Sequence, residues 1–168
     1  MDPAPGLREF TEEVAARLVL FDEPGPEVKR LRERYGFTQE VLAGLLSLTR
    51  ESLSRIESGH VSPTRPFIQR FTRIMALAKG AREHLAYMEA RDAFPDERHL
   101  TQLAAGLRIE KQAAEEVILA ASMSYEAKRR ETLRGLGSRS RRPAAPGGLR
   151  ARPVPPEAPR LPIQGELP

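Results

Sequence analysis

Apolar residues recur at helical spacing along most of this chain, and the clearest case is residues 38–59. Thr38 and Thr49 each precede a short apolar run, and a threonine in that position can accept a hydrogen bond from the first-turn amides, as an N-cap does. Gly59 follows the second run, where a left-handed residue ends a helix easily. The apolar positions are Leu42, Leu45, Leu46, Leu53 and Ile56. The pattern predicts two short helices joined by a tight turn.

The flanking segments predict two more helices. The first begins at Pro26 and ends before Gly36, because proline suits the first turn of a helix and glycine suits its end. This helix carries Val28, Leu31, Arg32 and Tyr35. The second covers residues 66–77, and its apolar stripe is Phe67, Ile68, Phe71, Ile74, Met75 and Leu77. Residues 26–79 are therefore expected to form a small helical bundle with one core.

The rest of the chain divides into three segments. Residues 1–25 predict an amphipathic helix, which packs on the bundle or contacts a second subunit. Its apolar face is Leu7, Phe10, Val14, Leu18 and Phe21. Residues 80–137 predict an all-helical extension, used either for dimerisation or for core packing. Residues 138–168 are rich in Pro and Arg, and such a stretch buries too little apolar area to offset the entropy of ordering, so a disordered tail is expected.

Residues 26–79 resemble the Cro/C1-type helix-turn-helix family of transcriptional regulators, also called the XRE family. The matching residues are Leu31, Arg32, Phe37, Thr38, Gln39, Glu40, Leu42, Ala43, Arg50, Ile56, Glu57, Ser58, Gly59, Ser62 and Pro63. The resemblance implies an all-α, lambda-repressor-like bundle. Ser47 stands where the family usually has glycine in the turn, and serine adopts the left-handed conformation only at some cost.

The resemblance also implies how DNA is read. Residues 49–58 would be the recognition helix in the major groove, with Arg50, Glu51 and Arg55 at the base-reading positions. Arginine can donate two hydrogen bonds to guanine, and glutamate can accept one from the cytosine amino group, so a G·C-containing half-site is expected. The alternative is that these side chains are solvated charges on an exposed helix.

Four further residues are candidates for contacts with DNA phosphate. Gln39 and Thr49 stand at helix starts, where amides and short polar side chains meet phosphate. Ser54 and Arg65 are the other two candidates. A separate, structural role is implied for Arg32 and Glu57, which in the resembling family pair across the bundle.

Charge is distributed as DNA binding requires. Residues 26–79 hold ten Lys or Arg against five Glu, and residues 138–168 hold six Arg against two Glu. Residues 1–25 are acidic, with two Arg against six Asp or Glu. Positive charge on the helix-turn-helix segment and the tail suits phosphate. An ordinary mixed-charge surface remains the alternative.

The sequence offers no catalytic or metal-binding constellation. There is no Cys, and His60, His84 and His99 are scattered without metal-ligand spacing, so they are expected on the surface or in loops. Glu115 and Glu116 are adjacent, and adjacent residues of a helix do not face each other. We therefore expect neither an enzyme nor a cofactor.

The sequence also predicts where the protein acts and with which partners. It has no apolar run of about 18 residues that would cross a membrane, and its start lacks the features of a secretory signal. We expect a cytoplasmic, sequence-specific transcriptional regulator that binds double-stranded DNA as a homodimer. The alternative is a protein-binding adaptor or an antitoxin-like partner that uses the same fold, with residues 80–137 contacting the partner.

Overall fold

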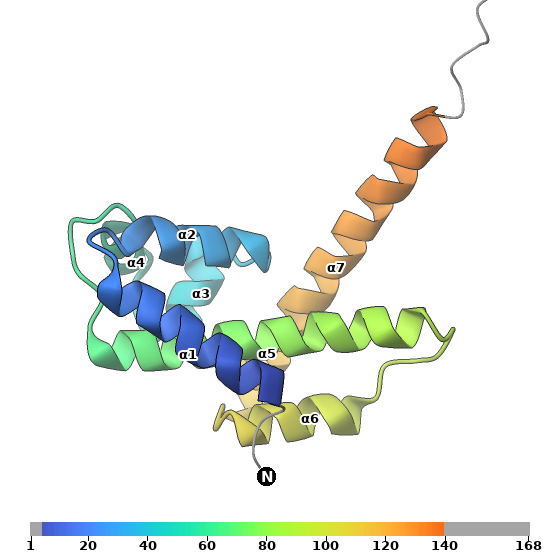
Figure 1. Ribbon diagram of the computed structural model, residues 1–168, viewed down its shortest axis with the longest axis horizontal. Helices are drawn as coiled ribbons and strands as arrows, with labels where there is room; N and C mark the ends of the chain where they lie inside the picture. Colours follow the sequence, from blue (N-terminus) through green and yellow to red (C-terminus); the bar gives the residue numbers. More distant parts are fainter. Residues whose placement is uncertain (1–4, 140–168) are drawn as a thin grey trace, which may run out of the picture.

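The computed structural model describes residues 5–139, and over that range the chain forms seven α-helices (Figure 1). They are α1 (Pro5–Leu20), α2 (Gly25–Arg34), α3 (Gln39–Leu45), α4 (Arg50–Glu57), α5 (Arg65–Glu89), α6 (Glu97–Gly106) and α7 (Lys111–Arg139). The expected all-α class, with an N-terminal helix and a C-terminal helical extension, is confirmed. Residues 140–168, which hold most of the predicted tail, lie outside the described residues.

Hydroxyl caps set the starts of α3, α4 and α5. The Thr38 Oγ1 atom accepts a hydrogen bond from the Val41 amide at 3.2 Å, and the Thr49 Oγ1 atom accepts one from the Ser52 amide at 3.1 Å. Both caps had been predicted. Thr64 caps α5 in the same way, because its hydroxyl accepts a hydrogen bond from the amide of Phe67 at 3.4 Å.

One hydrophobic core joins α2, α3, α4 and the first half of α5. Leu31, Leu42, Leu53 and Phe71 each come from a different one of these helices, and each is fully buried. Full burial of such a side chain contributes about 1.5–3 kcal/mol relative to exposure. The core therefore fixes the angle at which the short helices α3 and α4 meet.

The helix α1 packs along α5. Leu7, Val14 and Leu18 are buried there, and the ring of Phe10 meets the ring of Tyr35 edge-on at 6.4 Å between centroids. The prediction that Phe21 belongs to this apolar face was wrong, because α1 ends at Leu20 and the Phe21 side chain is 50 % exposed. Within a single chain, α1 covers the bundle.

The helix α5 runs without a break for 25 residues. The predicted helix at residues 66–77 and the start of the predicted extension at residues 80–137 are both parts of it, so the expected boundary between residues 79 and 80 falls inside a helix. Gly80 does not interrupt it, because α1 and α6 enclose it: an added Cβ atom would lie 3.1 Å from Leu7 and 3.2 Å from Leu103.

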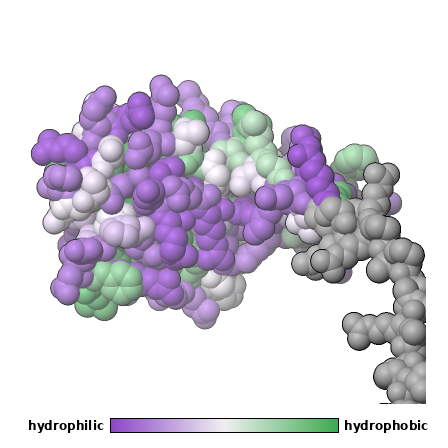
Figure 2. Space-filling view, turned by 90° about the horizontal axis from the view of Figure 1, so that it is seen from above, coloured by the Kyte–Doolittle hydropathy of each residue, from purple (hydrophilic) through white to green (hydrophobic). Residues whose placement is uncertain are grey.

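The C-terminal helices extend this arrangement. Leu100, Leu103 and Leu107 are buried, and Asp96 caps α6 by accepting a hydrogen bond from the Arg98 amide at 2.9 Å. The first half of α7 packs on α5 and α6, and its second half projects away from the body of the molecule (Figure 1). Seen from above, hydrophobic residues form only small groups on a mainly hydrophilic face (Figure 2).

Candidate nucleic-acid interface

The helix α4 has one buried and one exposed face. Leu53, Ile56 and Glu57 are buried, whereas Arg50 and Arg55 are exposed. Glu51 and Ser54 are also exposed and lie on the same side as the arginines. The three predicted base-reading residues therefore share the solvent face of an eight-residue helix. No described element covers that face.

The turn between α3 and α4 contains the left-handed serine that the sequence analysis described as costly. Ser47 has a positive φ of 57°, a region that costs a non-glycine residue roughly 1–2 kcal/mol. Two hydrogen bonds hold the turn, from the Ser47 amide to the Gly44 carbonyl at 3.0 Å and from the Leu48 amide to the Ala43 carbonyl at 2.8 Å. This pair of bonds is the usual way in which a helix end satisfies its last carbonyl groups.

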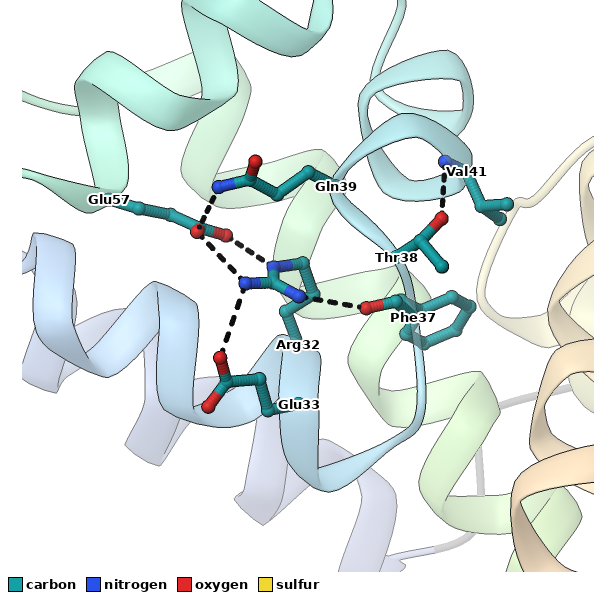
Figure 3. A network of polar contacts seen from close by, with 7 residues as sticks. All are labelled: Arg32, Glu33, Phe37, Thr38, Gln39, Val41 and Glu57. Atoms are coloured by element: carbon teal, nitrogen blue, oxygen red, sulfur yellow. Dashed lines mark hydrogen bonds and ion pairs between the residues drawn. The ribbon is translucent and has the colours of Figure 1, made fainter. Parts of the chain in front are cut away.

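A buried ion pair ties α4 to α2 (Figure 3). The Arg32 Nε atom donates to Glu57 Oε1 at 2.6 Å, and Arg32 Nη2 donates to Glu57 Oε2 at 3.1 Å. The Arg32 Nη1 atom donates to the Phe37 carbonyl at 3.0 Å. The hydrogen bond with Glu57 raises the pKa of Arg32 above its usual value. The pairing implied by the family resemblance is thus present.

Gln39 is the predicted phosphate-contacting residue with the least freedom. It begins α3 and is half-buried, and its Nε2 atom donates to Glu57 Oε2 at 2.8 Å (Figure 3). No local sequence pattern predicted this bond, because the two residues are 18 positions apart. Contact between Gln39 and DNA remains a prediction, and the amide that would make it already donates one hydrogen to Glu57.

The other three predicted phosphate contacts are exposed. Thr49 accepts from the Ser52 amide, so its oxygen already has a role as the cap of α4. Ser54 lies on the open face of α4, and Arg65 is the first residue of α5. Contacts of Thr49, Ser54 and Arg65 with DNA remain predictions.

The close contact between α2 and the end of α4 was missed in the sequence. Gly25 begins α2, and a Cβ atom there would lie 2.5 Å from the carbonyl oxygen of Ile56 and 2.7 Å from that of Glu57. The sequence predicted only that a helix begins at Pro26 in the Pro24-Gly25-Pro26 run. Its glycine also lets two backbones approach, which no local pattern announces.

The histidines are less scattered than the sequence suggested. The rings of His84 and His99 stack at 4.6 Å between centroids, and the amide of Asp96 donates to His84 Nε2 at 2.9 Å. Burial, together with the neighbouring His99, lowers the pKa of His84. Among residues 5–139, no three His, Asp or Glu side chains come together as metal ligands.

The comparison with protein families identifies the central segment. Residues 25–85 match the family described as a helix-turn-helix domain, a span that holds α2, α3, α4 and most of α5. The chain therefore contains a helix-turn-helix domain. No curated protein and no solved structure matches the chain. Within the described range, no helix has both the length and the apolarity needed to cross a membrane.

Proposed function

We propose that this protein is a sequence-specific DNA-binding transcriptional regulator of the Cro/C1 type, with residues 49–58 as its recognition helix. The observation that carries the proposal is the open polar face of α4, built on a helix-turn-helix domain. Helices of this kind enter the major groove with their N-terminal residues against base edges. The proposed role places the protein in the cytoplasm.

Arg50, Glu51 and Arg55 are the residues proposed to read bases. Within residues 5–139 none of the three side chains takes part in an ion pair or hydrogen bond. Glu51 and Arg55 are one helical turn apart and still do not pair. Unpaired guanidinium groups can donate two parallel hydrogen bonds to guanine, and an unpaired carboxylate can accept from cytosine. We therefore expect a DNA half-site that contains G·C pairs.

Gln39, Thr49, Ser54 and Arg65 are proposed to contact phosphate. They lie at the first turns of α3, α4 and α5 or on the open face of α4. Amides at helix starts point toward an approaching anion, and phosphate contacts fix the register of the protein on the duplex. Arg65 is the residue of the four that carries a charge, so it should contribute most to the salt dependence.

The direct test uses operator fragments selected from the source genome by the protein itself. Arg50→Ala and Arg55→Ala should each weaken operator binding by roughly 1–3 kcal/mol, measured by fluorescence anisotropy at fixed salt. Arg98→Ala is the matched control, because Arg98 is equally exposed but lies on α6. Unchanged affinity in both α4 variants would reject the proposal.

We also propose a homodimer, because one short recognition helix reads few bases and a two-fold axis doubles the site. The helical extension is the proposed contact surface. On α7 the side chains of Leu119, Met123 and Leu133 are each more than half exposed. Sedimentation equilibrium should give twice the mass of 18.7 kDa. Met123→Glu with Leu133→Glu should return it to the monomer value.

A protein-binding adaptor or antitoxin-like function is the second candidate, and one observation favours it. A cavity of about 550 Å³ opens between the second halves of α5 and α7, and Ala86, Tyr125 and Leu133 contribute to its lining. Charged residues line this groove as well, namely Arg82, Glu83, Glu89, Lys128 and Arg129. A groove of this mixed kind suits a partner helix that carries both apolar and charged side chains. Failure to enrich any DNA fragment, together with a partner captured through this groove, would favour the adaptor.

A further inference from the structure

Three arginines line a second cavity, whose lining includes no residue of α4. This cavity has a volume of about 240 Å³ and lies between α5 and the corner that joins α6 to α7. Arg70 and Arg73 reach it from α5, and Arg108 reaches it from the corner. Leu45, the last residue of α3, lines the same cavity, so it adjoins the helix-turn-helix pair.

These arginines lack the carboxylate partners that several other basic residues of the described chain have. In the described part of the chain, Arg17, Arg30 and Arg32 all pair with carboxylates. Arg70, Arg73 and Arg108 form no ion pair there, and Glu110 is the single carboxylate in the lining. The lining therefore carries three positive charges against one negative charge. Clefts lined by one sign of charge concentrate the opposite ion.

The backbone at Arg108 strengthens the case for a ligand. Arg108 has a positive φ of 56°, and it follows α6 as a terminating residue: its amide donates to the Ala105 carbonyl, and the Ile109 amide donates to the Ala104 carbonyl, both at 3.0 Å. Glycine is the usual residue at this position. An arginine here strains the backbone and brings a guanidinium to the cavity. Strained residues of this kind cluster at functional sites.

The remaining lining suits a small anion. Ala113 lies in the first turn of α7, where helix amides have no acceptor within the helix. Ile74 is buried beneath the cavity and gives it an apolar floor. The volume is below the roughly 300 Å³ at which pockets for drug-sized ligands begin. Arginine groups bind phosphate through two parallel hydrogen bonds.

We propose that Arg70, Arg73 and Arg108 bind one phosphate group in this cavity. The group belongs either to a small phosphate ester or to the backbone of bound nucleic acid, because the recognising chemistry is the same. This phosphate site is additional to the base-reading residues proposed above. Its first test contains no DNA, so its failure and the failure of the DNA-binding proposal are separable.

The first arm titrates the full chain with inorganic phosphate, and amide NMR signals report the binding. Chloride keeps the ionic strength constant. Signals of residues 70–73 and 109–113 should shift and saturate in the millimolar range. Arg70→Gln with Arg73→Gln should weaken this binding at least tenfold. Arg108→Gly should do the same while the thermal transition stays or rises, because glycine suits the left-handed backbone. Arg98→Gln is the control and should bind as the parent does.

The second arm uses a short duplex without an operator and measures binding against salt concentration. If the pocket takes a backbone phosphate, Arg70→Gln with Arg73→Gln lowers the magnitude of the salt slope by about 0.9. Saturation with free phosphate, or this loss of slope, supports the site and identifies the source. The proposal is overturned if both are absent, if chloride alone reproduces the shifts, or if the arginine variants bind phosphate as the parent does.

Discussion

Arg32 and Glu57 are 25 positions apart, and their side chains meet at 2.6 Å between Nε and Oε1. The Glu57 side chain is 3 % exposed and that of Arg32 is 10 % exposed. Two hydrogen bonds from Arg32 and a third from Gln39 hold the carboxylate. Paired groups of this kind hold geometry well, because either charge alone would be costly in the interior. The pair fixes the end of α4 to α2.

Breaking this pair should destabilise the fold strongly. Arg32→Met leaves the Glu57 carboxylate buried without its partner, and we expect a loss of about 3–5 kcal/mol in the free energy of unfolding, measured by urea titration. Combining Arg32→Met with Glu57→Leu should recover most of the loss, since no uncompensated charge remains. Arg98→Met, at an exposed site, should change stability by less than about 0.5 kcal/mol. A double variant as unstable as the single one would contradict this account.

Arg65 should act on all DNA sequences alike. It is exposed and begins α5, so Arg65→Ala is expected to weaken binding uniformly and to reduce the salt slope by about one. The measurement compares an operator duplex with a scrambled duplex over a range of salt concentrations. A changed base preference, with the salt slope intact, would show that Arg65 reads a base instead.

Gly25 should tolerate no side chain. Gly25→Ala would put a methyl group against the carbonyl oxygens that end α4, and overpacking of this kind costs about 1–3 kcal/mol. Gly44→Ala is the matched control. Its Cβ atom would meet nothing within 4 Å, and alanine in a helix is favoured over glycine by roughly 0.5–1 kcal/mol. Thermal unfolding should therefore move in opposite directions for the two variants, and equal shifts would argue against the close contact.

Glu27 should make stability depend on pH in the acid range. Its hydrogen bond with Arg30, aided by the Arg17 charge, lowers the pKa of Glu27 below the usual 4.5. The unfolded chain therefore binds the proton more readily, so the stabilisation is present above pH 4.5 and is lost as pH falls through the lower folded value. Glu27→Gln should remove this part of the acid dependence, seen as a smaller loss of stability between about pH 5 and pH 3.

The control for that experiment is Glu116→Gln. Glu116 lies exposed on α7 and forms no ion pair within the described residues. Its variant should keep the acid loss of the parent protein. If the Glu27 variant also keeps the full loss, the ion pairs of Glu27 with Arg30 and Arg17 do not carry this pH dependence.

The sequence alone determined the local structure of the central domain. The caps Thr38 and Thr49 and the apolar stripes of α3 and α4 lie where the pattern predicted them, because caps and helical periodicity are short-range properties of the chain. The exposed positions of Arg50, Glu51 and Arg55 follow from that same periodicity. Their contacts with DNA remain predictions.

The tertiary structure decided everything that joins residues far apart in the sequence. It joined the predicted helix at residues 66–77 to the start of the predicted extension in α5, and it placed Gly25 against α4. It also made Gln39 a hydrogen-bond donor to Glu57 and brought three arginines to one cavity. Phe21 stayed exposed although its spacing fitted the stripe. Spacing along a chain reports which face of a helix a residue occupies. It carries no information on which element packs against that face, because the packing depends on the angles at which the helices cross.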